Sequence, residues 1–259
     1  MEYRDIQVEV EGRAMTIRLN RPDRLNALGS RMRQELIDAL GQRAPGGDGI
    51  RAVILTGSGN AFSSGADIRE NTGKPTRDII VKDLRDSFHV IAKLIRDSDR
   101  IFISAVNGVA AGAGISIALL CDMVFASPSA RFVTAFQDIG LAPDTGLSYI
   151  LSRASGRRFA GQLIIGGEFS AAEAQEAGLL RVVNDPVAAA REAARKVSEG
   201  GPFLAYVKAK RLVNRSLFWD FEEFLTYEAQ QQADLAETHD FLEGVTAFRE
   251  KRKAVFSGT

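Results

Sequence analysis

The sequence predicts an α/β protein, and three observations lead to this class. Runs of β-type apolar residues at 52–56, 101–106 and 123–126 are continuous, as in strands buried on both faces of a parallel sheet. Segments with helical apolar spacing lie between these runs. The chain has 259 residues with 45% hydrophobic content, which is enough to bury such a sheet. Strands that alternate with helices therefore indicate an α/β core in the first half of the chain.

The N-terminus is predicted to form a hairpin. Segments 6–10 and 14–19 alternate apolar and polar residues, and the turn Glu11-Gly12-Arg13 separates them. The alternation ends at Arg21-Pro22-Asp23-Arg24, because proline cannot continue a paired strand. The hairpin is thus expected to precede the first buried strand.

Helices are predicted on both sides of the first buried strand. Met32, Leu36 and Leu40 recur at fourfold spacing, which indicates one amphipathic helix. A second helix is expected over 78–96. A loop rich in proline and glycine is expected at 44–49. A third helical segment is expected after Gly112.

The strand signals stop after residue 140, so the rest of the chain is predicted to be helical. Ser170 and Glu173 form a capping box, and Gly178 stands at the position of a C-terminal cap. Further helices are expected over 186–199, 202–215, 217–236 and 238–253. Asp144 also stands where it could cap a helix beginning at Thr145.

The chain is divided here into two predicted parts. Residues 1–190 would form an α/β core, and residues 191–259 a helical C-terminal segment. The second part is too apolar to remain in water, so we expect it to pack on its own core or on a neighbouring subunit. The residues that indicate this are Phe218, Trp219, Phe221, Phe224 and Leu225.

Composition and charge exclude several classes of protein. Lys+Arg and Asp+Glu are both 33, so the basic excess of a nucleic-acid or membrane-surface protein is missing. A single cysteine, Cys121, and a charged N-terminus without an apolar leader favour a cytoplasmic protein. Cys121 is expected to be a buried thiol, and His89 a surface or hydrogen-bonded histidine. No metal site is expected, because neither His89 nor His239 has a partner at ligand spacing.

Two turns of small residues form the candidate site. One covers residues 61–68 after the first buried strand, and the other covers 105–114 between a strand and a helix. Small residues let the backbone approach a ligand closely, and a helix N-terminus presents free amides. Two converging amides would hold a thioester oxygen as it gains enolate charge. The spacing alone also fits turns that serve only close packing of helix on strand.

Other sites that use small residues fit the sequence less well. Gly112-Ala113-Gly114 is not followed by the third glycine of a dinucleotide fingerprint or by the lysine of a phosphate loop. Ser63 and Ser64 lack the pattern of a nucleophile elbow, so a serine hydrolase is not expected. Asp67 is expected to be a structural carboxylate that accepts hydrogen bonds from turn amides.

Motifs along almost the whole chain occur in a consistent order. They are Leu19-Asn20-Arg21-Pro22, Leu25-Asn26-Ala27-Leu28, 61–70, 105–122, Ala130-Arg131-Phe132, Gly140-Leu141-Ala142-Pro143-Asp144, Glu243-Gly244 and 247–252. Together they resemble the successive signatures of the enoyl-CoA hydratase/isomerase (crotonase) superfamily. The resemblance implies a crotonase-like spiral of ββα units with a helical C-terminal trimerisation region. It also implies an enzyme that acts on acyl-CoA thioesters as a homotrimer or hexamer, with coenzyme A only as part of the substrate.

The same resemblance implies roles for particular residues. Ala66 and Ala113 fall at the two oxyanion-hole positions. The backbone around 25–27 and 64–68 would receive the adenine and pantetheine of coenzyme A, and Phe248 and Lys251 would reach the coenzyme of an adjacent subunit. The residues implied in substrate binding are Arg24, Leu25, Ala27, Ser64, Asp67, Ile68, Gly112, Phe136, Leu141, Phe248 and Lys251.

Two positions depart from the hydratases of this superfamily. Where those enzymes carry two glutamates that hold the added water, this chain has Ser116 and Phe136. A hydroxyl and a phenyl ring cannot act as a carboxylate acid/base pair. Ordinary hydration is therefore not expected. A hydratase that uses Asp144, and a coenzyme A-binding protein without activity, are the alternatives.

Asp144 is the acid left in a suitable place. The surrounding motifs most resemble the 1,2-epoxyphenylacetyl-CoA isomerase branch and Δ3,Δ2-enoyl-CoA isomerases, in which one acid shuttles a proton between carbons. An apolar pocket to which Phe136 contributes would raise the pKa of such an acid. Leu147 and Ser148 depart from the glycine-rich continuation of the epoxide branch. The general isomerase prediction is therefore better supported than a ring substrate.

Overall fold

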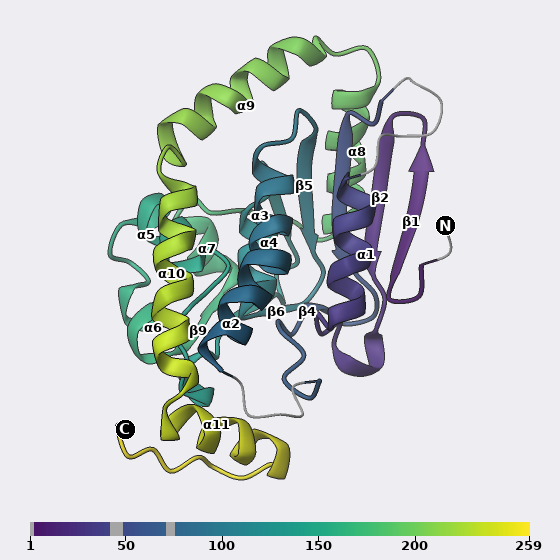
Figure 1. Ribbon diagram of the computed structural model, residues 1–259. Helices are drawn as coiled ribbons and strands as arrows, with labels where there is room; N and C mark the ends of the chain where they lie inside the picture. The colour runs from purple at the N-terminus through teal and green to yellow at the C-terminus, as the bar shows by residue number, and fades with distance from the viewer. Residues whose placement is uncertain (1–2, 42–48, 71–75) are drawn as a thin grey trace.

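The computed structural model describes residues 3–41, 49–70 and 76–259 (Figure 1). The strands are β1 (Ile6–Glu11), β2 (Ala14–Leu19), β3 (Ala52–Gly57), β4 (Ala61–Ser63), β5 (Ile101–Val106), β6 (Val109–Ala111), β7 (Met123–Ala126), β8 (Arg131–Thr134), β9 (Gly167–Ser170) and β10 (Arg181–Val182). Within the described ranges they form a sheet in the order β1-β2-β3-β5-β7-β10 and a second in the order β4-β6-β8-β9.

The helices of the described chain lie between and after these strands. They are α1 (Ser30–Gly41), α2 (Arg77–Asp83), α3 (His89–Arg96), α4 (Ala113–Leu119), α5 (Leu147–Ser155), α6 (Ala160–Ile165), α7 (Ala171–Glu176), α8 (Pro186–Ser198), α9 (Phe203–Leu217), α10 (Phe221–Ala236) and α11 (His239–Glu250). Shorter turns are the 3₁₀ turns η1 (Pro22–Arg24) and η3 (Gln137–Ile139) and the π turn η2 (Leu84–Phe88). In the described ranges, none of these helices is long and apolar enough to cross a membrane.

The first sheet confirms the predicted hairpin and buried strands. β1 and β2 pair antiparallel with Ile6 opposite Leu19, and β2, β3, β5 and β7 then pair in parallel. Every residue of β3 and of β5 is buried. The sheet is covered on both faces, which explains why these strands are apolar runs without alternation.

The second sheet was not predicted, and the expectation that strands stop after residue 140 is wrong. β9 pairs antiparallel with β8, and β10 pairs in parallel with β7. These strands are only two to four residues long, too short to show a period of two. Phe132 and Phe169 stack with ring centroids 5.1 Å apart, which joins β8 to β9.

The predicted helices are confirmed with small changes at their ends. The helix predicted over 78–96 is α2 and α3, joined by the π turn. Ser170 Oγ accepts from the N–H of Glu173 at 3.2 Å, and Gly178 has a φ of 75°, as the capping box and C-terminal cap predict. The loop predicted at 44–49 lies, apart from Gly49, outside the described residues.

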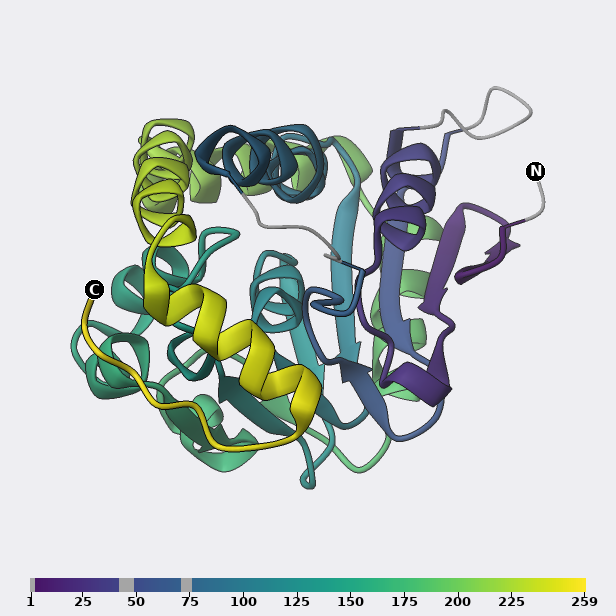
Figure 2. The same ribbon diagram turned by 60° about the horizontal axis from the view of Figure 1, so that its bottom comes forward.

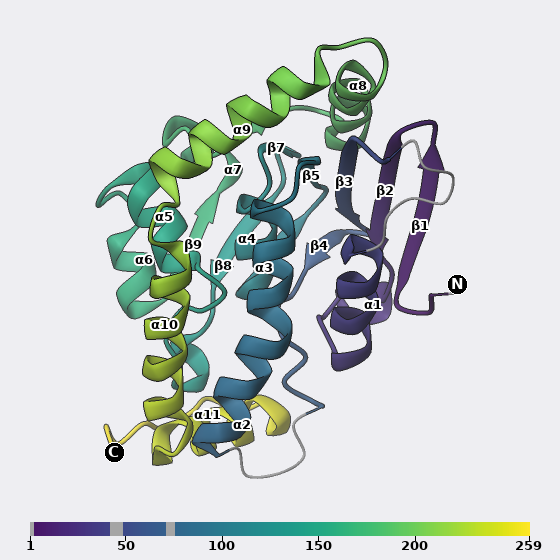
Figure 3. The same ribbon diagram turned by 45° about the horizontal axis from the view of Figure 1, so that its top comes forward.

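The C-terminal helices wrap around the core, as Figures 1 and 3 show. α9 arches over one end of the large sheet, and α10 runs beside α2 and α3. Phe221, Leu225 and Ala229 of α10 are buried in the main hydrophobic cluster. The expectation that this segment packs on its own core is confirmed. A division of the chain at residue 190, inside α8, stays a prediction.

Candidate active site

The two predicted turns meet in space. A Cβ on Gly65 would lie 2.7 Å from the carbonyl oxygen of Ala111 and 3.4 Å from the nitrogen of Ala113. Gly65 has a φ of 83° and Gly112 has φ 51° and ψ −128°, which glycine adopts without steric cost. Ala113 opens α4, so its N–H has no acceptor within the helix. Because Gly65 and Gly112 have no side chains, the turns that carry Ala66 and Ala113 can approach each other closely.

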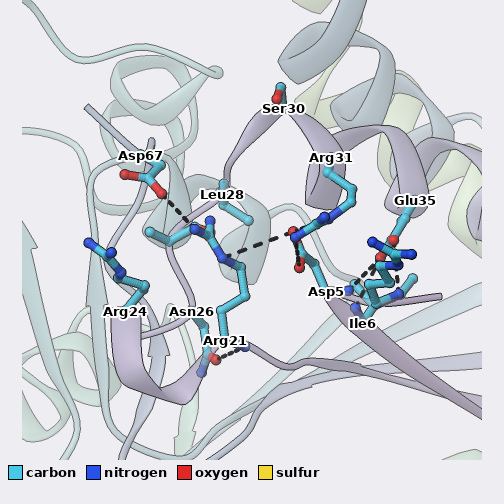
Figure 4. A network of polar contacts seen from close by, with 12 residues as sticks. Asp5, Ile6, Arg21, Arg24, Asn26, Leu28, Ser30, Arg31, Glu35 and Asp67 are labelled. Carbon is cyan, nitrogen blue, oxygen red and sulfur yellow. Dashed lines mark hydrogen bonds and ion pairs between the residues drawn. The ribbon is translucent and has the colours of Figure 1, made fainter. Parts of the chain in front are cut away.

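The segment that carries Arg24, Asn26 and Leu28 lies beside the first of these turns, which carries Asp67 (Figure 4). Leu28 forms a parallel bridge with Ala66, and the N–H of Ser64 donates to the carbonyl oxygen of Leu25 at 2.9 Å. Leu25 and Asn26 both have positive φ, at 50° and 56°. The buried Asn26 amide holds this conformation, since its Nδ2 donates to the carbonyl oxygen of Ala61 at 2.8 Å. Leu25 and Ser64 thus lie together beside the turn, whereas Ala27 is buried.

An arginine that the sequence did not single out organises this edge. Arg21 Nη2 lies 2.9 Å from Asp67 Oδ2, and its Nη1 donates to the carbonyl oxygen of Ala27 at 2.9 Å (Figure 4). The Asp67 side chain is 7% exposed. Its carboxylate also accepts from the N–H of Arg69 at 3.3 Å. Asp67 therefore forms an ion pair with Arg21. The neighbouring Arg24 is exposed.

Asp144 accepts four hydrogen bonds, two at its backbone carbonyl and two at its carboxyl group. Its carbonyl oxygen accepts from Ser116 Oγ at 3.1 Å and from the N–H of Leu147 at 3.0 Å. Its carboxyl oxygens accept from Thr145 Oγ1 at 2.9 Å and from Gln232 Nε2 at 3.1 Å. Ser116 is three residues after Ala113 on α4, about one helical turn. Asp144 therefore lies about one turn along α4 from the amide of Ala113.

The alternative role of Asp144 as a helix cap is wrong. α5 begins at Leu147, and its cap residue Gly146 makes no side-chain hydrogen bond to the helix. Thr145 has a φ of 55° and Gly146 a φ of 78°, so neither residue is in the right-handed helical region. The carboxyl group of Asp144 is thus not used by the helix that follows.

Burial shapes the electrostatics around Asp144. Removal from water, reinforced by the charge of Glu228, raises the pKa of Asp144 to about 7. Burial also raises the pKa of Glu228 to about 8, against hydrogen bonds from the backbone of Gly146 and Thr145. Burial therefore favours the protonated form of both carboxyl groups.

His89 differs from its prediction as a surface or hydrogen-bonded side chain. It is 5% exposed, and its Nε2 lies 3.4 Å from Glu228 Oε1 with no hydrogen-bond partner in the described part of the chain. Burial lowers the pKa of His89 to about 4, so the imidazole is neutral at pH 7. The sequence pattern missed this burial because the covering helix, α10, is distant along the chain.

Phe136 lies against the second turn. The ring is 6% exposed, and its Cζ would lie 3.6 Å from a Cβ on Gly112. Leu141, five residues later, is partly buried against the same cluster. Ile68 is partly buried at the end of the first turn. Phe136 therefore makes the wall beside the Ala113 amide apolar.

The C-terminal candidates lie on α11 and at its end. This helix, yellow in Figure 2, packs against η3 of its own chain. Phe248 is 46% exposed, and Lys251 ends the helix with a φ of 56°. Contact of Phe248 or Lys251 with a neighbouring subunit's coenzyme stays a prediction. Cys121 is buried, as expected. Within 3–41, 49–70 and 76–259 no cluster of three or more histidine, cysteine or acidic residues could hold a metal.

The chain is similar to known proteins along almost its whole length. Residues 9–259 match the family model of enoyl-CoA hydratase/isomerase. A probable enoyl-CoA hydratase of Rhodobacter capsulatus is 37% identical over 100% of both chains. A 1,2-epoxyphenylacetyl-CoA isomerase of Escherichia coli is 35% identical over 100% of this chain and 99% of the relative. The crystal structure of an enoyl-CoA hydratase from Mycobacterium avium subsp. paratuberculosis superposes with a TM-score of 0.85 at 32% identity, covering 99% of this chain and 100% of that one.

Proposed function

The chain belongs to the enoyl-CoA hydratase/isomerase family, and from this premise we propose that it isomerises an unsaturated acyl-CoA with Asp144 as the proton shuttle. The observation that carries the proposal is the place of Asp144: its backbone carbonyl accepts from Ser116, about one helical turn after Ala113 on α4, and the pKa of its carboxyl is raised to about 7. Ser116 and Phe136 stand where the resemblance places the two glutamates of a hydratase. Asp144 is therefore left as the acid for the reaction.

The proposed reaction moves one proton. The Asp144 carboxylate removes a proton from C2 of a 3-enoyl thioester, and the thioester oxygen takes up the negative charge. The N–H groups of Ala66 and Ala113 would stabilise that charge. Asp144 then returns the proton to C4, which gives the conjugated 2-enoyl thioester and restores the carboxylate. No electrons are exchanged with the enzyme, so the step needs no redox cofactor.

The test is to supply purified protein with a trans-3-enoyl-CoA and follow the ultraviolet absorbance of the conjugated product. A rise in absorbance would support isomerisation. Loss of absorbance from a 2-enoyl-CoA, without isomerisation, would instead indicate the hydratase that several relatives are named for. Binding of coenzyme A thioesters without turnover would indicate a non-catalytic homologue.

We also propose that the coenzyme lies along the surface formed by residues 24–27 and 64–68.

Lys251 is proposed to contact a phosphate of the coenzyme. Replacing Lys251 with alanine is expected to raise KM for an acyl-CoA on the order of fivefold with kcat unchanged, since an exposed phosphate contact contributes at most about 1 kcal/mol. Steady-state kinetics measure this. Lys208→Ala, which removes an exposed lysine on α9, is the control. An unaltered KM would remove Lys251 from the coenzyme site.

A homotrimer or hexamer is part of the proposal. Exposed apolar side chains follow α9 and the turn after it: Leu204, Leu212, Val213, Leu217 and Trp219. Such side chains commonly become buried between subunits. Light scattering during gel filtration is expected to give three or six times the mass of one chain. A mass equal to one chain would contradict the assembly.

A further inference from the structure

Gln232 of α10 contacts Ala142 and Asp144, which lie 90 and 88 positions earlier in the chain. Its side chain is 1% exposed. Its Oε1 accepts from the N–H of Ala142 at 3.1 Å, and its Nε2 donates to the carbonyl oxygen of Ala142 at 2.8 Å. The same Nε2 donates to Asp144 Oδ2 at 3.1 Å. One buried amide thus joins the backbone of Ala142 to the carboxyl group of Asp144.

The backbone of Ala142 fixes which end of the Gln232 amide faces Asp144. A backbone N–H only donates and a backbone carbonyl only accepts, so Ala142 requires the amide oxygen at its N–H and the amide nitrogen at its carbonyl. In the reversed orientation the amide oxygen would face two other oxygens, the Ala142 carbonyl and the Asp144 carboxyl. The group that reaches Asp144 is therefore an NH2 group, which donates and cannot accept.

The two carboxyl oxygens of Asp144 consequently have partners of different kinds. Oδ2 meets the NH2 group of Gln232, whereas Oδ1 meets the hydroxyl of Thr145 at 2.9 Å. A hydroxyl can turn, so it can either donate or accept. Both oxygens accept a hydrogen bond when the carboxylate is ionised. In the protonated acid, an O–H on Oδ1 can donate to the Thr145 hydroxyl, whereas a proton on Oδ2 would weaken that oxygen as the acceptor for Gln232.

We propose that Gln232 is a positioning residue for the proton shuttle: it keeps Oδ2 of Asp144 as a hydrogen-bond acceptor, so that the carboxyl group takes up and returns the proton at Oδ1. In the isomerisation the C2–H bond breaks, its proton joins Oδ1, and its electron pair enters the thioester enolate. The proton on Oδ1 is then transferred to C4. The inference rests on the proposed role of Asp144 in catalysis.

A substitution of Gln232 by methionine tests the hydrogen bond without changing any charge. Among the described residues, Glu228 of α10 and His89 of α3 act electrostatically on the Asp144 carboxyl. Lys93 of α3 forms an ion pair with another acid of α10. These groups are the same in the wild type and in Gln232→Met, because one neutral side chain replaces another of similar length. A change in the titration of Asp144 can therefore be assigned to the lost hydrogen bond.

The first test is the pH profile of kcat/KM for isomerisation. Asp144 must be ionised to accept the proton, and a hydrogen bond donated by Gln232 favours the ionised form. Gln232→Met is therefore expected to move the acid-side midpoint up by about one pH unit, with KM unchanged above the midpoint. Gln231→Met, the same change at the adjacent exposed position, is the control and should keep the wild-type midpoint. A lower rate with the midpoint in its wild-type place would make Gln232 a structural residue and overturn the inference.

The second test locates the proton by infrared spectroscopy and does not depend on turnover. At about pH 6 the Asp144 carboxyl is mostly protonated, because burial raises its pKa to about 7. Its carbonyl stretching band is the one that Asp144→Asn removes from the spectrum. With the proton on Oδ1 the carbonyl oxygen is Oδ2, so loss of the Gln232 hydrogen bond in Gln232→Met should move this band to higher wavenumber. A band at the same wavenumber in both proteins would place the proton on Oδ2 and overturn the proposal.

The two tests separate the inference from the proposed function. A shifted band without isomerase activity would leave the proton on Oδ1 and reject the isomerase alone. Isomerase activity that depends on Asp144, with an unshifted band, would reject the inference alone. If Gln232→Met does not fold, nuclear magnetic resonance of the glutamine side-chain amides replaces it. One amide signal of the wild type should then move as Asp144 ionises and stay in place in Asp144→Asn, and the lack of such a signal would overturn the proposal.

Discussion

Asp144→Asn is expected to isomerise a 3-enoyl-CoA at least about a hundredfold more slowly than the wild-type protein, because general acid–base groups contribute about 10²–10⁴-fold to rates. Asparagine has the shape of aspartate but cannot carry the proton. Its carbonyl oxygen can accept from Gln232 Nε2, and its amide can donate to Thr145 Oγ1, so both contacts of the native carboxyl are retained. The loss is expected in kcat, with coenzyme binding unchanged.

Single-turnover absorbance measurements and thermal unfolding would check this together. The variant should unfold at about the wild-type temperature near pH 5, where the native Asp144 is protonated. Asp138→Asn, at an exposed position of η3, is the matched control and should keep full activity. Wild-type turnover in Asp144→Asn would remove Asp144 from the mechanism.

Gly65→Ala is expected to have an effect of similar size by a different route. The new Cβ would lie 2.7 Å from the carbonyl oxygen of Ala111, a backbone atom that cannot rotate away. The turns that carry Ala66 and Ala113 would have to separate. Loss of one oxyanion donor lowers kcat about 10²–10³-fold. We therefore expect a fall in kcat of about a hundredfold or more, together with reduced stability.

Gly12→Ala provides the control for this backbone change. Gly12 has a φ of 58°, in the same left-handed region as Gly65, but no atom lies within 4 Å of its Cβ position. The control therefore has a similar conformational cost without the contact between turns. Its kcat should equal that of the wild type. A Gly65→Ala variant with normal kcat would show that the close approach of the turns is not needed for turnover.

The central strands and the longer helices were predictable because each contains enough residues to show a pattern. β3 and β5 are six-residue strands made mostly of apolar residues, and α1 repeats its buried residues at fourfold spacing. The short strands of the second sheet contain too few residues for any period. They form because neighbours such as Phe132 and Phe169 meet across the fold.

The candidate site was predictable only in part, for the same physical reason. The small-residue turns and Asp144 lie in local motifs. Glu228 contacts Gly146 across 82 positions of sequence, and Gln232 contacts Asp144 across 88. An amphipathic helix such as α10 indicates which face is buried. It does not indicate which polar group on that face will meet a turn elsewhere in the chain.

Ser116 has a consequence for how this chain could change over evolution. Its hydroxyl supports the carbonyl oxygen of Asp144, and Phe136 fills the wall beside Gly112. A mutation of Ser116 to glutamate would add one carboxylate while removing a support of Asp144, the proposed proton shuttle. A glutamate in place of Phe136 would bring a charge into a closely packed apolar wall. Each single substitution is therefore expected to cost a contact before the pair could act together, so the effects of the two substitutions should not add.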